Sequence, residues 1–179
     1  MDQIETKPSP ATATGPSLRK SLAIVVDIAD LAVSNDPTAA LITYSLGSCI
    51  GLAIWDPVAK VGGMLHYMLL ESQLAPDKAR ANPPMFCDTG VPKLFRAAYE
   101  LGAVKSRLIT KVAGGSQLLD DNGTFNIGKR NYLALRKIFW KNGVMINAES
   151  VGGSVSRTLK LEVGTGVVTI KSRNQEVLL

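Results

Sequence analysis

The sequence has a single histidine, His66, and only two cysteines, Cys49 and Cys87, among 179 residues. Histidine is the side chain whose ordinary pKa lies nearest neutrality, so a cysteine or serine hydrolase mechanism in this chain would need His66 as its general base. Two cysteines cannot build a disulfide framework, and this inventory is too small for the usual zinc sites. We therefore expect two free thiols and no metal or cofactor.

Long hydrophobic runs are also absent. The longest, at 50–55 and 64–70, fall far short of the roughly 20 residues that a membrane-spanning helix needs. Residues 1–21 are polar, contain three prolines and lack the apolar stretch of a secretory signal. These features predict a cytoplasmic protein with a disordered leader over 1–21 and a single domain over 22–179.

Acidic residues are outnumbered, 15 against 20 lysines and arginines, and the basic excess lies mostly between Lys93 and Lys141. A basic excess favours an acidic partner. The sequence has no basic run interleaved with aromatic residues and no zinc-finger spacing, so we do not expect nucleic-acid binding. A solvated basic face and a docking face for an acidic protein both remain open.

The apolar pattern predicts a mixture of strands and helices that do not alternate one for one, which favours an α+β domain over a doubly wound sheet. Residues 71–84 are expected to form a surface loop. Expected helices lie at 91–101 and 130–141, and expected strands at 22–26, 39–44, 50–55, 64–69, 107–112, 144–150, 156–163 and 167–172.

The strands at 50–55 and 64–69 form a predicted hairpin around Asp56 and Pro57. If its turn is centred between Pro57 and Val58, Cys49 lies opposite His66, and Ile50 lies opposite Leu65 on the other face. Directly opposed residues have Cβ atoms about 4.5 to 5.5 Å apart. The thiol and the imidazole would then be able to meet.

A cysteine and histidine pair of this kind suits the hydrolysis of an amide. An adjacent imidazolium lowers the pKa of a thiol from about 8.5 and gives a thiolate at neutral pH. Thr43 or Ser45 would orient the imidazole, and the backbone N–H groups near Gly47 and Ser48 would bind the oxyanion. The alternative is that Cys49 is a small core residue and His66 a structural one, as we expect for Cys87.

Two segments resemble the CheD family of chemoreceptor glutamine deamidases: Thr43-Tyr44-Ser45-Leu46-Gly47-Ser48-Cys49-Ile50 and Gly63-Met64-Leu65-His66-Tyr67-Met68-Leu69. Three further segments resemble family motifs: Lys111-Val112-Ala113-Gly114-Gly115, Ile127-Gly128-Lys129-Arg130-Asn131, and Gly152-Gly153 with Arg157. The resemblance implies a catalytic triad of Thr43, Cys49 and His66. It adds Gly114 and Gly115 to the expected substrate and oxyanion region with Gly47 and Ser48.

The resemblance also implies a fold and a function. The fold is a mixed β-sandwich flanked by helices, similar to the catalytic domain of the glutamine-deamidating necrotising toxins. The function is hydrolysis of glutamine side chains on methyl-accepting chemoreceptors in bacterial chemotaxis, with a CheC-type phosphatase as a further partner. The alternative is a non-catalytic adaptor that binds the receptor or CheC. Ala113, Ser150 and Ser156 depart from the family pattern of phenylalanine, aspartate and glycine.

Overall fold

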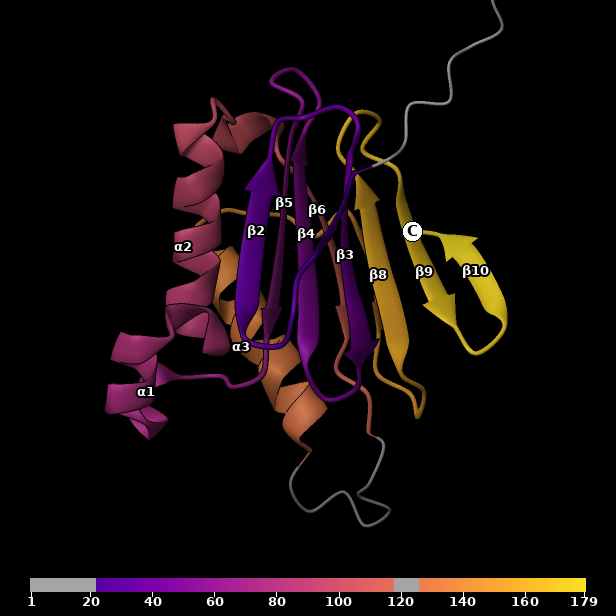
Figure 1. Cartoon of the computed structure of the whole chain (residues 1–179). Helices are drawn as coiled ribbons and strands as arrows, with labels where there is room; N and C mark the ends of the chain where they lie inside the picture. Colours follow the sequence, from indigo (N-terminus) through magenta and orange to yellow (C-terminus); the bar gives the residue numbers. More distant parts are fainter. Residues whose placement is uncertain (1–21, 118–125) are drawn as a thin grey trace, which may run out of the picture.

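The computed structural model describes residues 22–117 and 126–179. The leader predicted for 1–21 lies outside the described residues. Figure 1 shows two β-sheets packed face to face, with the helices gathered on the outer face of one of them. None of the helices in the described part of the chain is both long and apolar enough to cross a membrane.

Each sheet has five strands and contains both parallel and antiparallel pairs. The first has the order β1-β3-β8-β9-β10, and the second has the order β2-β5-β4-β6-β7. Within them β1 pairs with β3 and β6 with β7 in parallel, and the other pairs are antiparallel. The strands are β1 (Leu22–Val25), β2 (Asp30–Ser34), β3 (Ala39–Leu46), β4 (Ile50–Asp56), β5 (Val61–Tyr67), β6 (Ile109–Gly114), β7 (Ala148–Val151), β8 (Arg157–Glu162), β9 (Val168–Ser172) and β10 (Gln175–Leu178).

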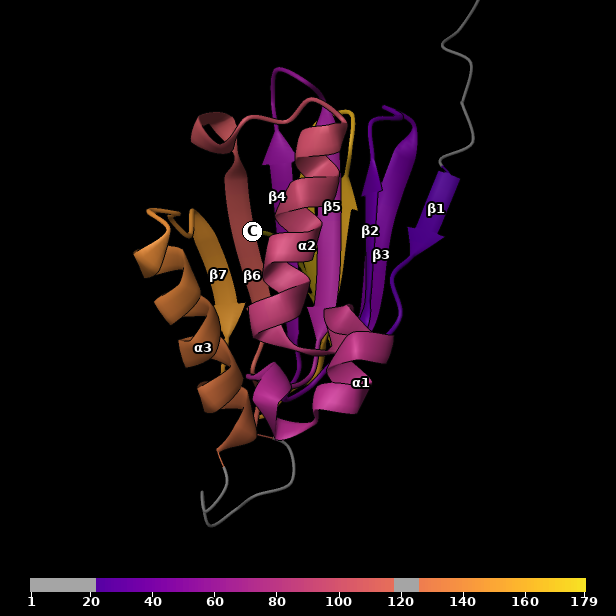
Figure 2. The same cartoon turned by 90° about the vertical axis from the view of Figure 1, so that its left-hand side faces the viewer.

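Helices α2 (Cys87–Glu100) and α3 (Ile127–Lys141) cover the outer face of the second sheet, as Figure 2 shows. The apolar residues of α2 recur every three or four positions, so that Val91, Leu94 and Ala98 are buried on one face. One core cluster lies between this sheet and the helices, and a second lies between the two sheets. The predicted α+β class, a mixed β-sandwich flanked by helices, is confirmed.

Several predicted elements differ in detail from the structure. The segment 71–84, expected to be a loop, contains the helix α1 (Pro76–Ala81) between two short 3₁₀ turns. Pro76 occupies its first turn, where a missing N–H costs nothing. The edge strand β2 and the terminal strand β10 were not predicted, because their residues are mostly exposed or half-buried and lack a clear apolar alternation. The strand predicted at 144–150 is shorter and forms β7.

The hairpin of β4 and β5 has a different register from the predicted one. Its partners are Ile50 with Tyr67 and Gly51 with His66, so Cys49 does not lie directly opposite His66. The turn contains four residues after Asp56, whose carboxylate accepts hydrogen bonds from the N–H groups of Val58 and Ala59. This turn moves the pairing by two residues, and a two-residue shift leaves every side chain on its predicted face.

Candidate active site

His66 is held in the layer between the two sheets by Thr43. His66 lies near the end of β5 and Thr43 in the middle of β3 in the facing sheet, and both are fully buried. The Thr43 Oγ1 atom lies 2.7 Å from His66 Nδ1. His66 Nε2 is buried and has no hydrogen-bond partner among the described residues. If Nδ1 carries the proton and donates it to Thr43, Nε2 is left as a free base.

The thiol of Cys49 lies on the same side of its sheet as His66. Cys49 immediately precedes β4, two residues before Gly51, the strand partner of His66. It packs against the inter-sheet cluster and is half-buried. This diagonal position places the two Cα atoms about 7 to 8 Å apart. No hydrogen bond joins the thiol to Nε2 in this structure.

Ser45, the other hydroxyl considered for orienting the imidazole, does not take that position. It is exposed and has a left-handed backbone (φ 58°) at an irregularity in β3. Thr43 is therefore the hydroxyl that contacts His66. Cys87 lies fully buried in the core beneath the helices, and burial raises its pKa to about 12.

The pKa shifts of Cys49 and His66 oppose the expected thiolate and imidazolium pair. Burial raises the pKa of the Cys49 thiol, although a hydrogen bond from its own backbone N–H acts in the opposite direction. Burial also lowers the pKa of His66 to about 4, although the charge of Asp27 acts against it. Both shifts favour a neutral thiol and a neutral imidazole at neutral pH over the expected ion pair, which stays a prediction. A neutral imidazole can still take the thiol proton as a bond to carbon forms.

The glycines at the end of β6 fix the backbone of the Cys49 loop. The N–H of Gly115 donates to the Cys49 carbonyl at 2.8 Å, and the N–H of Ser116 donates to the Gly47 carbonyl at 2.8 Å. The Gly115 N–H is thus unavailable to an oxyanion, which differs from the predicted role. In residues 22–117 and 126–179, the N–H groups of Gly47 and Ser48 have no protein acceptor, and they remain the candidate donors.

The remaining motifs converge on the same loop, which sequence reasoning did not anticipate. Asn131 in α3 donates from Nδ2 to the Ser48 carbonyl at 3.1 Å. Arg157 in β8 donates from one terminal nitrogen to Ser116 Oγ at 2.6 Å and from Nε to Ser150 Oγ at 3.0 Å. A serine at 150 therefore keeps a hydrogen bond to Arg157 but brings no charge. No local pattern could have shown the contacts of Asn131 with Ser48 and of Arg157 with Ser116, because they join segments 83 and 41 positions apart in the chain.

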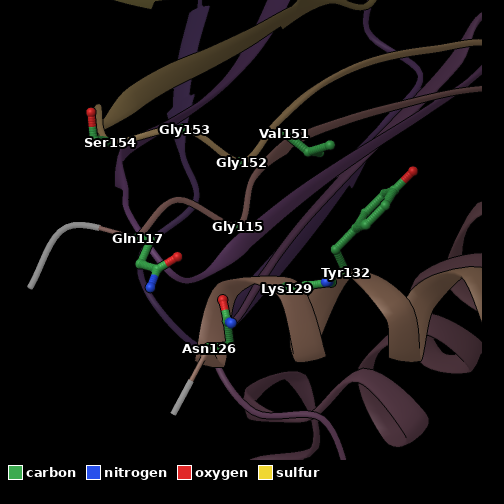
Figure 3. A pocket seen from close by; sticks show the side chains of 9 residues that line it. All are labelled: Gly115, Gln117, Asn126, Lys129, Tyr132, Val151, Gly152, Gly153 and Ser154. Carbon is green, nitrogen blue, oxygen red and sulfur yellow. The ribbon is translucent and has the colours of Figure 1, made fainter. Parts of the chain in front are cut away.

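A pocket of about 530 Å³ lies beside this loop. Figure 3 shows Gly115, Gly152 and Gly153 along one side and Asn126 and Lys129, near the start of α3, on the other. Gly115 lines the pocket, and its N–H also donates the hydrogen bond to the Cys49 carbonyl. The pocket is therefore a candidate for receiving part of a substrate.

The burial of His66 predicts a loss of stability in mild acid. As the pH falls, the unfolded chain takes up a proton near pH 6.5, whereas the folded protein does so only near 4. The free energy of unfolding should therefore fall between about pH 6.5 and 4 by up to about 3 kcal/mol. Urea denaturation at a series of pH values measures this slope.

His66→Gln serves as the matched control because glutamine does not titrate. In this variant the slope between about pH 6.5 and 4 should be smaller, whatever its stability at neutral pH. An equal slope in both proteins would mean that other groups cause the acid sensitivity.

Comparison with known proteins places the chain in a family. The model of the family described as CheD chemotactic sensory transduction matches residues 68–172. Relatives named probable chemoreceptor glutamine deamidase CheD include CheD 1 of Syntrophus aciditrophicus (54% identical, covering 83% of this chain and 93% of the relative) and CheD of Solibacter usitatus (50%, covering 86% and 90%). A third is CheD 2 of Anaeromyxobacter dehalogenans (47%, covering 85% and 96%). A crystal structure of the Neisseria meningitidis protein NMB0706 has a TM-score of 0.44 at 10% identity, covering 74% of this chain and 63% of that one, which is too distant to support an argument. By sequence, this chain belongs to the CheD family.

Proposed function

We propose that this protein is a chemoreceptor glutamine deamidase that converts glutamine side chains of methyl-accepting chemoreceptors to glutamate and releases ammonia. The observation that carries the proposal is the 2.7 Å contact between Thr43 and His66 Nδ1, which leaves Nε2 unpartnered on the sheet face that Cys49 shares. Relatives named probable chemoreceptor glutamine deamidase, 54% and 50% identical, support the same reaction and substrate. We place the activity in one cytoplasmic domain spanning 22–179.

The proposed reaction has two halves. Cys49 Sγ attacks the amide carbon while its proton passes to His66 Nε2, and the developing oxyanion is held by the N–H groups near Gly47 and Ser48. The protonated imidazole then gives this proton to the departing ammonia, which leaves a thioester. In the second half, His66 takes a proton from water as the water oxygen attacks the thioester. Collapse of this intermediate forms the glutamate carboxylic acid, and the thiolate of Cys49 recovers the proton from His66.

Mass spectrometry of a purified receptor cytoplasmic fragment tests this proposal. Incubation with the protein should convert glutamine to glutamate at particular sites, with the mass gain that replacement of an amide NH₂ by OH produces. Cys49→Ala, incubated in parallel, should leave the fragment unchanged. Binding of the fragment without any change in mass would favour the adaptor alternative over the enzyme. Binding to a CheC-type phosphatase is a separate prediction that a pull-down with that protein would test.

Thr43 should act by orienting His66 rather than by contacting substrate. Thr43→Val keeps the shape of the side chain but removes the hydroxyl that lies 2.7 Å from Nδ1. We expect turnover to fall by about 10- to 100-fold, since small misplacements of a catalytic group have effects of this size. Thr43→Ser, which retains a hydroxyl, should keep most of the activity. Equal losses in both variants would remove Thr43 from the triad.

Helix α3 should provide the docking surface for the receptor. The helix carries five basic residues and no acidic one, a charge equal to the net +5 of the whole chain. Its outer face also exposes Trp140 (82%) and Leu133 (49%). Reversing two charges, Arg136→Glu with Lys137→Glu, should slow receptor association most clearly at low salt, because charges at the rim of an interface mainly raise the encounter rate.

A matched reversal in the opposite sheet controls for net charge. Lys171→Glu with Arg173→Glu changes the charge by the same amount at exposed positions at the end of β9. It should leave the association rate closer to the wild-type value. Stopped-flow or surface plasmon resonance measurements at two salt concentrations distinguish the pairs. If both pairs slow association equally, net charge alone steers the encounter, and α3 has no special part.

A further inference from the structure

Asn131 joins the two chain segments that carry Cys49 and His66. Its side chain is fully buried, and Nδ2 donates to the Ser48 carbonyl at 3.1 Å and to the Met68 carbonyl at 2.9 Å. Ser48 immediately precedes Cys49, and Met68 follows His66 by two residues. We propose that Asn131 is a positioning residue that sets the distance between the nucleophile and its base.

The first turns of α3 are seated firmly enough for this task. The hydroxyl of Tyr67 donates to the backbone carbonyl of Asn131 at 2.8 Å. Gly128, one turn earlier, packs so closely on the segment just after β6 that an added Cβ would lie 2.4 Å from the Gly115 carbonyl oxygen. The position of Asn131 is therefore fixed by the hydrogen bond to its backbone carbonyl and by the close packing of Gly128 one turn earlier in the helix. Because Asn131 is held in place, its side-chain amide can hold the segments that contain Ser48 and Met68.

The amide acts through its two N–H donors. Asn131 Oδ1 is buried and has no hydrogen-bond partner among the described residues. A buried acceptor without a partner destabilises a protein, whereas two buried carbonyls gain a donor each from Nδ2. Ser48 and Met68 both lie outside the strands β4 and β5, so neither carbonyl belongs to the ladder that joins these strands. Asn131 thus supplies a connection at the point where the sheet pairing ends.

This connection matters because the thiol and the imidazole are not themselves hydrogen-bonded. Their separation depends on how the loop before β4 and the segment after β5 are placed. A displacement of about 1 Å at a reacting group can lower the rate about 100-fold. Loss of the Asn131 amide frees both segments at once, so its effect should appear in the chemical step rather than in substrate binding.

The test compares Asn131→Leu, which keeps a similar volume but has no donor, with the wild-type protein. Two quantities are measured: kcat and KM on the receptor fragment, and the rate of Cys49 alkylation by iodoacetamide as a function of pH, with Cys87 as the internal reference. For Asn131→Leu we expect kcat to fall about 10- to 100-fold with little change in KM. We also expect the pH at which Cys49 becomes reactive to rise, because the thiol loses its base.

Asn147→Ala is the matched control for a merely structural asparagine. Asn147 Oδ1 accepts a hydrogen bond from the Thr110 N–H at 2.8 Å, at the start of β6 and away from the Cys49 loop. This variant should lose stability without moving the alkylation profile. If Asn131→Leu does not fold, Asn131→Ala, which also removes both donors, is measured at low temperature. An unchanged profile and unchanged kcat in a folded Asn131 variant would overturn the proposal.

The inference rests on the proposed roles of Cys49 and His66, and its failure can be told apart from theirs. Alkylation of Cys49 requires no receptor, so it reports on the Asn131 connection even if the wild-type protein leaves the receptor mass unchanged. In that case the proposed deamidase function fails while the positioning of the thiol is still measured. Deamidation by the wild-type protein with an unaffected Asn131→Leu variant would retain the function and reject this inference.

Discussion

Replacing His66 with glutamine should lower the rate of receptor deamidation by about 1000-fold, within the range that a general acid and base contributes. His66 is the sole histidine in the chain, so no other imidazole can substitute for it. Both halves of the proposed reaction need the group at Nε2, first to take the thiol proton and then to activate water. The measurement is the initial rate of ammonia release, followed together with the mass of the receptor fragment.

A second variant separates the two proposed roles of the His66 ring, the basic Nε2 atom and the hydrogen bond between Nδ1 and Thr43. His66→Asn retains a nitrogen close to the position of Nδ1, which lies 2.7 Å from Thr43 Oγ1, but has nothing in place of Nε2. Both variants should be inactive, and both should still bind the receptor fragment with near wild-type affinity. Activity above about one tenth of wild type in His66→Gln would exclude His66 as the base, because that loss is smaller than general-base catalysis supplies.

The sequence allowed the two faces of the central hairpin to be predicted but not its register. Alternating residues such as Ile50 and Leu52 showed which side meets the core, and an error of two residues preserves that assignment. The register depends on the turn, where the Asp56 carboxylate holds two backbone N–H groups and Lys60 has a left-handed backbone (φ 53°). A choice between turns of different length could not be made from the apolar pattern.

The supporting contacts of the site were beyond prediction for a different reason. Thr43, Cys49 and His66 could be named because their chemistry is distinctive and they lie within 24 residues of one another. Asn131 reaches Ser48 across 83 positions, and Arg157 reaches Ser116 across 41. Such contacts depend on how α3 and β8 pack. The pKa shifts of Cys49 and His66 likewise follow from burial, which is a property of the folded chain.

Gly114→Ala should be severely destabilising and should disable the thiol. Gly114 has a φ of 108°, which side chains rarely adopt, and an added Cβ would lie 2.2 Å from the Cys49 carbonyl oxygen. The backbone strain alone costs about 1 to 3 kcal/mol, and relief of the clash requires the Cys49 backbone to move. We expect a loss of about 3 kcal/mol or more in the free energy of unfolding, together with slower alkylation of Cys49 in the protein that remains folded.

Gly102→Ala isolates the contribution of the clash. Gly102, just after α2, has a φ of 93°, but an added Cβ would meet nothing within 4 Å. This variant carries a similar backbone strain without the collision, so it should lose about 1 to 3 kcal/mol and keep normal Cys49 reactivity. The difference between the two variants measures how tightly β6 holds the carbonyl of Cys49, the proposed nucleophile. The opposite outcome is that the two variants lose equal stability and are alkylated at equal rates. The Cys49 loop would then move away from β6 at no cost in free energy, and the contacts of Gly114 and Gly115 with the Cys49 carbonyl would have no part in placing the thiol.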